Sequence, residues 1–229
     1  MKVNYRDRIL YIFALVMLFS LTLGVFAEDN SNVNVLPHLI KASSYLSQND
    51  LRVIANYHPY YLIDNDPNTA WVEGASGSGI KETVLMWVAI PQNATIKIAI
   101  RNGFQKTGEL FYKNNRVKEL EVTFMLGNLY DAEYLSKIYT LEDITGWQII
   151  EFKSEKECRY IAFTIHSVYR GTTYDDTCIS DINISIDNDL GINTTLQKEI
   201  RNEYNLWFKE RTEKSRFFKN LPADYPFKQ

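Results

Sequence analysis

The chain has 229 residues, a formal net charge of −3 and a pI of about 5.7, and 45% of its residues are hydrophobic and 14% aromatic. An acidic chain without a basic stripe is a poor partner for nucleic acid, so this composition excludes a nucleic-acid-binding protein. The hydrophobic content is that of a folded domain and excludes a mainly disordered chain.

Residues 1–27 are predicted to be a signal peptide. Lys2, Arg6 and Arg8 give a positive start, an uncharged apolar run follows, and the small residue Ala27 ends it before a polar stretch. An uncleaved membrane anchor is the alternative, because the run is about long enough to span a bilayer. Cleavage would leave a mature chain with a charge near −5 and no stable membrane span, secreted or held in the periplasm or at the cell surface.

Residues 28–41 have little pattern and are predicted to be a linker, and residues 42–189 show repeated strand signals. Short alternating or continuous apolar runs are separated by turns, with no helical pattern between them, which is typical of an antiparallel β-sandwich. The clearest predicted strands are residues 83–90, 94–100, 117–126, 146–152, 160–168 and 179–186.

The turn from Asp64 to Thr69 is acidic and tightly determined. Pro67 fixes one φ angle, and the Asp and Asn residues fold their side chains back on the backbone. Acidic oxygens in a sharp turn are what a hard cation such as Ca²⁺ needs. The alternative is a purely structural turn anchored by Trp71, which we assign to the core.

Five motifs occur in order along the chain: residues 64–74 (DNDPNTAWVEG), 77–82 (GSGIKE), 100–106 (IRNGFQK), 112–118 (YKNNRVK) and 168–182 (VYRGTTYDDTCISDI). Together they resemble the discoidin-like (coagulation-factor type C, galactose-binding-like) domains. Within that group they are similar to the glycan-binding domain first recognised as the translocation module of a streptococcal NAD glycohydrolase toxin. The resemblance implies an all-β, antiparallel jelly-roll β-sandwich that binds a glycan through its end loops.

The resemblance also implies a structural Ca²⁺ site formed by Asp64, Asp66, Thr69 and Asp181. Asp181 stands where the family has a glutamate, and Asn65 stands where glycine is usual. Since Asp181 lies in the last predicted strand, its carboxylate would join the end of the domain to its first turn.

Glycan ligands are recognised by directional hydrogen bonds and by aromatic stacking. Amides, carboxylates and arginine bond sugar hydroxyls, and tyrosine rings stack on the apolar face of a pyranose. The loop residues that we predict to bind the glycan are Glu73, Asn102, Arg116, Tyr169, Tyr174 and Asp175. Each could instead hold its loop in place. If they bind the ligand, Arg116→Ala or Tyr169→Ala should abolish binding with little loss of stability.

The two cysteines, Cys158 and Cys178, are predicted to be buried thiols, although export would permit a disulfide. If the strands that follow them form a hairpin, the cysteines lie at its opposite ends, about 30 Å apart. A disulfide needs Cα atoms within about 7 Å. A different strand order would undo this argument.

Residues 190–229 are predicted to form a helical and extended tail that starts with a helix capped by Thr194 or Thr195. Apolar residues share one face of this helix: Leu196, Ile200, Tyr204, Trp207 and Phe208. Between Lys198 and Lys219 the tail carries seven basic and four acidic residues. The helix either packs on the sandwich or docks an envelope protein, a host protein or an anionic surface.

The sequence holds no motif for catalysis. Its three histidines show no metal-binding or nucleophile spacing, and His166 fits an ordinary sheet position. Glu73 and Glu82 could face each other as a glycosidase pair, but nothing else supports that interpretation. We therefore expect an exported, non-catalytic carbohydrate-binding module. The alternative is an envelope scaffold whose basic aromatic tail docks a protein partner.

Overall fold

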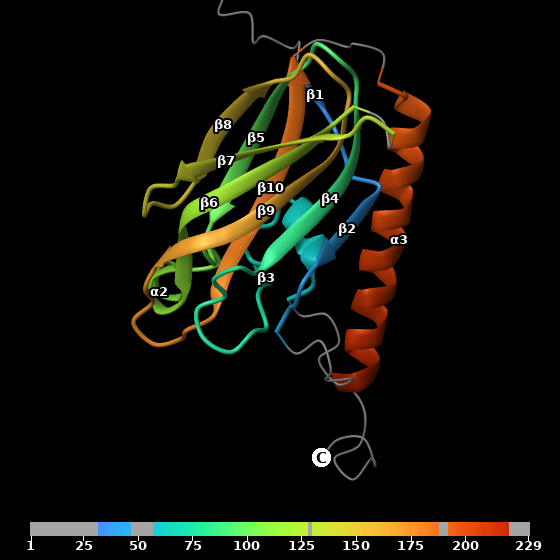
Figure 1. Ribbon diagram of the computed structural model, residues 1–229. Coiled ribbons are helices and arrows are strands. Elements are labelled where there is room, and N and C mark those ends of the chain that lie inside the picture. The colour runs from blue at the N-terminus through green and yellow to red at the C-terminus, as the bar shows by residue number, and fades with distance from the viewer. Residues whose placement is uncertain (1–31, 47–56, 128–129, 188–191, 220–229) are drawn as a thin grey trace, which may run out of the picture. The chain divides into compact units, whose positions relative to one another are not determined.

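The computed structural model describes residues 32–46, 57–127, 130–187 and 192–219, of which residues 214–219 are described by backbone only (Figure 1). The first strands are β1 (Asn32–Asn34), β2 (Leu39–Ala42), β3 (Trp71–Val72), β4 (Thr83–Ile90) and β5 (Thr95–Asn102). The remaining strands are β6 (Asn115–Leu126), β7 (Glu133–Thr140), β8 (Trp147–Lys153), β9 (Cys158–Tyr169) and β10 (Thr177–Asp187). The helices are the 3₁₀ helix η1 (Pro59–Ile63), α2 (Gly108–Lys113) and α3 (Thr194–Lys219).

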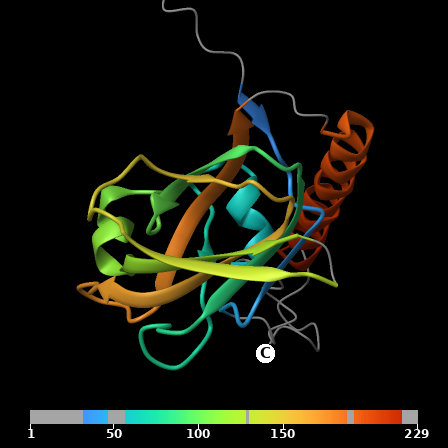
Figure 2. The same cartoon turned by 45° about the horizontal axis from the view of Figure 1, so that its top comes forward.

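The strands form a β-sandwich with two antiparallel layers, as predicted (Figures 1 and 2). One layer has the order β2-β4-β9-β6 with β7 at its end, and the other has the order β10-β5-β8, with β1 and β3 also paired to β10. The layers join where β6 and β10 pair in parallel, over the two pairs Thr177–Asn115 and Cys178–Arg116. This short link closes one side of the sandwich.

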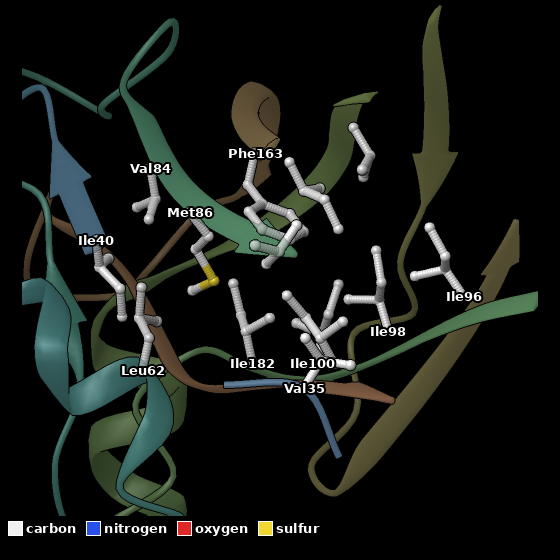
Figure 3. Packing of buried hydrophobic residues seen from close by; sticks show 14 of the residues in the cluster. Val35, Ile40, Leu62, Val84, Met86, Ile96, Ile98, Ile100, Phe163 and Ile182 are labelled. Atoms are coloured by element: carbon white, nitrogen blue, oxygen red, sulfur yellow. The ribbon is translucent and has the colours of Figure 1, made fainter. Parts of the chain in front are cut away.

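The core lies between the layers and follows from the alternation of the strands. In β5 every second residue is buried, which places Ile96, Ile98 and Ile100 inside and leaves the intervening side chains partly exposed. Figure 3 shows these isoleucines facing Met86 and Phe163 of the other layer. Trp71 is fully buried, as predicted, and its indole N–H donates to the Ser44 carbonyl at 3.0 Å.

Two parts of the sandwich differ from the prediction. The predicted linker at residues 28–41 contributes β1, paired with β10, and most of β2, paired with β4. β7 was not predicted, because almost all of its side chains are exposed and no apolar alternation marks it. β7 pairs with β6 alone, so backbone hydrogen bonds hold it more than burial does.

Both cysteines are free and buried, as predicted, but the hairpin argument was wrong. β6 lies between β9 and β10, so the strands that carry Cys158 and Cys178 are not neighbours. Cys158 packs in the main core, and Cys178 packs with Ala70 and Val72 in a second, small cluster. The thiols are separated because they belong to different clusters.

The helix α3 packs on the sandwich, which is one of the two alternatives predicted for it (Figure 2). Its cap is Asn193 and not Thr194 or Thr195, since the Asn193 side-chain oxygen accepts from the Leu196 amide at 3.0 Å. Ile200 and Tyr204 are buried, and the Tyr204 hydroxyl donates to the Pro37 carbonyl at 2.7 Å.

Aromatic rings hold α3 against η1, and we call them the η1–α3 cluster. Its members are Tyr45, His58, Tyr60, Tyr61, Tyr204, Trp207 and Phe208. The Trp207 ring lies 4.8 Å from the His58 ring and 5.0 Å from the Tyr60 ring, centroid to centroid. Together with Tyr45, at 5.1 Å, these contacts place three aromatic rings around His58.

Among the described residues, no helix is long and apolar enough to cross a membrane. The predicted signal peptide and the predicted extended segment after residue 219 lie outside the described residues.

Candidate functional site

A cavity of about 270 Å³ lies among the loops that flank α2 and precede β10, and we call it the loop cavity. Its wall combines aromatic rings with one amide and one carboxylate. The small cluster of Ala70, Val72 and Cys178 lies at its base. The residues that line the cavity are Leu46, Tyr57, Val72, Phe104, Leu110, Asn114, Tyr174 and Asp176.

Asn115 fastens the loop that carries Tyr174 and Asp176. Its side-chain amide donates to the Asp175 carbonyl at 2.6 Å, and its side-chain oxygen accepts from the Gly171 amide at 2.7 Å. A Cβ atom at Gly171 would lie 2.6 Å from the carbonyl carbon of Asn114, so only glycine allows the loop to approach α2 this closely. The loop therefore has a fixed path beside the cavity.

Arg116, a predicted ligand residue, is 4% exposed and lies behind the cavity wall. Its guanidinium pairs with both carboxylate oxygens of Asp143, at 2.8 and 2.6 Å, and donates to the carbonyls of Asn114 and Arg170 at 2.9 and 3.0 Å. These bonds join three loops through one buried cation. Removal of Arg116 would leave Asp143 without this partner, so Arg116→Ala should lower stability, contrary to the prediction from the sequence.

Asn102, also predicted to bind ligand, is fully buried. Its side-chain amide donates to the Val117 carbonyl at 2.7 Å, and its side-chain oxygen accepts from the Val117 amide at 2.9 Å. The Asn102 side chain thus makes the two hydrogen bonds that a paired strand would make with Val117, and it links β5 to β6. Gly103 follows with φ of 76° and turns the chain toward Phe104 in the cavity wall.

Glu73 is fully buried at the end of β3. Its carboxylate accepts from the Ala75 amide at 2.7 Å and from the Thr177 amide at 3.1 Å, and burial raises its pKa. Gly79, at φ of 64°, packs directly on the Glu73 side chain. Glu73 therefore fixes the loop of residues 74–79, which contains three glycines, to the start of β10.

The last three predicted ligand residues lie at the end of β9 and on the loop that follows it. The half-buried Tyr169 donates its hydroxyl to the Leu141 carbonyl at 2.9 Å. Tyr174 is 47% exposed and lines the cavity, and Asp175 is exposed and pairs with Arg170. Of the six predicted residues, only Tyr174 lines the cavity, and Asp175 lies next to it in the chain.

Seven of the eight lining residues were not predicted as ligand contacts, and four of these have aromatic or polar side chains: Tyr57, Phe104, Asn114 and Asp176. Phe104, Asn114 and Asp176 lie within the sequence motifs, but the motifs do not show that these residues and Tyr57 line one cavity, because only the fold brings their segments together. Burial and the neighbouring Asp175 raise the pKa of Asp176. Burial and the charges of Cys178 and Asp176 raise the pKa of Tyr57.

The turn predicted to hold Ca²⁺ is closed by its own hydrogen bonds. One Asp64 carboxylate oxygen accepts from the Asp66 amide at 2.9 Å, and the other accepts from the Thr69 hydroxyl at 2.8 Å. Asn65 adopts φ of 58°, a conformation that asparagine tolerates in place of the usual glycine. Burial raises the pKa of Asp64 to about 6.

Asp181 meets this turn from β10, as predicted. One of its carboxylate oxygens pairs with Arg101 at 3.0 Å, and Arg101 lies over the Trp147 ring at 4.3 Å. The other oxygen, Oδ1, is buried without a well-aligned hydrogen bond in the described part of the chain, although the Asn65 amide lies near enough to favour the charged form. Burial and the Asp64 charge raise the pKa of Asp181 to about 7 despite Arg101.

Two mutually repelling carboxylates, the buried Asp181 and the half-buried Asp64, with one unpaired oxygen between them fit a bound hard cation. Within the described ranges no three His, Cys, Asp or Glu side chains group as metal ligands, so further ligands would have to be carbonyl, hydroxyl or water oxygens. Asp64, Asp181 and Thr69 are the residues that would hold the ion. The Asp66 side chain accepts a hydrogen bond from the backbone amide of Asn68 at 2.9 Å.

The family model described as "NAD glycohydrolase translocation F5/8 type C domain" matches residues 32–185. None of the curated proteins matches the chain. The match includes β1 and both predicted sites, and it ends before α3.

Solved structures similar to this chain include a mycobacterial protein, the arabinofuranosyltransferase AftD, with 16% identity and a TM-score of 0.48 over 69% of this chain. This chain spans only 12% of that protein's length. The family 32 CBM from C. perfringens NanJ, in complex with galactose, is 18% identical, with a TM-score of 0.43 over 66% of this chain and 98% of that one. An F5/8 type C domain from Bacteroides fragilis is 14% identical, with a TM-score of 0.45 over 69% of this chain and 99% of that one.

Proposed function

The chain belongs to the family of NAD glycohydrolase translocation F5/8 type C domains, and from that premise we propose that it is an exported, non-catalytic carbohydrate-binding module. The glycan binds in the loop cavity. One observation supports this most strongly: three aromatic rings, an amide and a carboxylate line one cavity of about 270 Å³. Tyr57, Phe104 and Tyr174 offer apolar faces for a sugar ring, and Asn114 and Asp176 offer groups that bond hydroxyls.

The residues of the sequence motifs act as supports for this cavity. Glu73, Asn102 and Arg116 each use their polar atoms on backbone groups or on Asp143. They fix the loops before a ligand arrives, so less conformational entropy is lost on binding. Direct contact with the glycan is proposed for Tyr174, with Asp175 at the rim.

Binding without catalysis is supported by the position of the two glutamates that could have formed a glycosidase pair. Glu73 is buried and accepts hydrogen bonds from two backbone amides. Glu82 accepts from the hydroxyls of Ser43 and Ser44, each at 2.5 Å. Both carboxylates are engaged in holding loops, and neither lines the loop cavity.

The alternative function is a scaffold whose C-terminal tail docks a protein. A tail that packs on the sandwich favours the binding module, and α3 packs through Ile200, Tyr204 and Trp207. We propose that the module acts outside the cytoplasm, either secreted or at the cell surface, after cleavage of residues 1–27. The mass of the purified exported protein tests the cleavage position after Ala27.

We also propose that Ca²⁺ stabilises the sandwich by binding between Asp64 and Asp181. The ion would offset the repulsion of these two carboxylates and tie β10 to the turn before β3. If it binds, millimolar Ca²⁺ should raise the melting temperature by several degrees, and a chelator should reverse the change. Asp181→Asn should lose this response. An identical melting temperature with Ca²⁺ and with chelator would contradict the site.

The test of the function is a broad glycan array, probed with protein expressed with its own leader and purified from the exported fraction. The array is run with Ca²⁺ and again with chelator. Selective binding to a few related glycans is the expected result. Folded protein that binds no glycan would contradict the proposal and favour the scaffold.

A further inference from the structure

The only charge among the described residues that line the loop cavity is negative. Asp176 is the single charged side chain among its lining residues, and no lysine, arginine or histidine of the described part of the chain lines it. Asp175 precedes Asp176, and Glu73 lies near enough to be influenced by the charge of Asp176. Because Asp175 is paired with Arg170 and Glu73 is buried behind the loops, Asp176 is the charge that faces the cavity.

Two bases close in sequence to lining residues are each paired with an acid. Arg170 pairs with Asp175, and Lys113 pairs with Glu109 at 2.5 Å, one helical turn away on α2. Nothing in this balance favours a negatively charged ligand.

The cavity is also small. At about 270 Å³ it lies just below the roughly 300–1,000 Å³ of pockets that enclose drug-sized molecules. Tyr57, Phe104 and Tyr174 are three rings around a space of that size, which suits one sugar ring and not a chain of them. A cavity of this size favours the terminal ring of a glycan over an internal one, because the rings on either side of an internal ring would need room that the cavity does not have.

We propose that the loop cavity takes one terminal sugar ring without a carboxylate, and that Asp176 is the residue that excludes acidic rings. This inference rests on the proposed function and names the ligand class of the same site. The Asp176 carboxylate accepts hydrogen bonds from sugar hydroxyls or from an amino group. A uronic or sialic acid carboxylate in the same cavity would meet a like charge, with no base among the described lining residues to offset it, which opposes binding.

The experiment compares three kinds of terminal ring on one array: neutral rings, amino sugars, and the acidic counterparts in which the same ring carries a carboxylate. The wild-type protein is expected to bind neutral or amino-terminated glycans at least tenfold more strongly than their acidic counterparts. Asp176→Asn keeps the shape and one acceptor but removes the charge, and it should reduce this preference at least fivefold. Glu151→Gln, an exposed carboxylate on β8 outside the cavity, is the matched control and should leave the preference unchanged.

The outcomes separate this inference from the proposed function. Wild-type binding that is equal for neutral and acidic rings, or stronger for acidic rings, overturns the inference while the module stands. An unchanged preference in folded Asp176→Asn overturns the role of Asp176. If no glycan binds at all, both the function and the inference are overturned. The backbone of residue 176 is held by the Asn115 amide, which donates to its carbonyl at 2.9 Å, so the substitution should fold, and a melting curve checks this.

Discussion

Tyr57 and His58 are neighbours in the chain, but they belong to two different aromatic regions, one that lines a cavity and one that is packed against a helix. Tyr57 lines the loop cavity with Phe104 and Tyr174. His58 is enclosed in the η1–α3 cluster, with Tyr45, Tyr60 and Trp207 rings within 5.1 Å of its own. The rings of the loop cavity surround an open space. The rings of the η1–α3 cluster pack against side chains of α3 and leave no such space.

The difference shows that aromatic content alone does not identify a binding site. The rings of the η1–α3 cluster pack against one another and against α3, so their contacts contribute to the free energy of unfolding. The rings of the loop cavity are held by polar supports behind them, such as Arg116 and Asn115, and their faces remain available. Substitutions should therefore separate the two regions by stability and by binding.

The largest effect is expected from Arg116→Ala. It leaves Asp143 without its partner and frees the carbonyls of Asn114 and Arg170, so the free energy of unfolding should fall by about 3–5 kcal/mol. Glycan binding should be lost as well, because the loop beside the cavity loses its anchor. Urea denaturation measures the first effect. Asp143→Ala is the matched variant, and wild-type stability in both would contradict the role of the pair.

Trp207→Ala should lower stability by a smaller amount and leave glycan binding intact. The half-buried ring contacts His58, Tyr60, Tyr61 and Phe208, and its removal should cost about 2 kcal/mol. Thermal unfolding and the glycan array together check this. A variant that remains folded but binds no glycan would show that the two regions are coupled.

Acid should weaken the η1–α3 cluster through His58. Burial, with a contribution from the Arg211 charge, lowers the pKa of His58 from 6.5 to about 4, and its Nδ1 accepts from the Tyr60 amide at 3.1 Å. Because the unfolded chain takes up this proton near pH 6.5 and the folded chain only near pH 4, stability from this group should fall as pH drops from 6.5 to 4. Below pH 4 it should lose no more.

His58→Gln isolates this effect, because other groups also titrate. Burial raises the pKa values of Asp64 and Asp181 to about 6 and about 7, and these acids change stability in the opposite direction in both proteins. The quantity to measure is the difference in unfolding free energy between wild type and His58→Gln at several pH values. A difference that does not change between pH 7 and pH 4.5 would contradict the burial of a neutral imidazole.

The smallest effect on stability is expected from Tyr174→Ala. The side chain is 47% exposed, so its removal should change the free energy of unfolding by no more than about 0.5 kcal/mol. Glycan affinity should fall about tenfold or more, because a stacking face of the cavity is lost. Tyr130→Ala, which removes a fully exposed tyrosine outside the cavity lining, is the control. Equal losses of affinity in both variants would remove Tyr174 from the site.

Much of the sandwich could be predicted from the sequence, because burial imposes alternation. The strand at 83–90 was predicted with its observed bounds, and β5, β8 and β9 were placed within one or two residues. β7 and β1 were missed since their side chains are mostly exposed and pairing with β6 and β10 is what makes them strands. Pairing between distant segments leaves little mark on local composition.

The candidate site could be predicted only in part. The motifs led to Glu73, Asn102 and Arg116, which turned out to be buried supports, because a loop with a fixed path needs specific polar residues and these are easy to recognise in sequence. The lining residues Phe104 and Asp176 are brought together because β5 pairs with β10 and Gly103 bridges to Ile179, a contact between segments far apart in the chain. No spacing in the sequence reveals that contact.

The most direct test of the account is to map the binding surface by amide chemical shifts, using the glycan that binds most strongly on the array. The predicted result is a set of shifted amides around Tyr57, Phe104, Asn114, Tyr174 and Asp176, with those of Ile200, Tyr204 and Trp207 in α3 unchanged. Shifts concentrated on α3 and η1, with the loop cavity unaffected, would contradict the assignment of the glycan to the cavity.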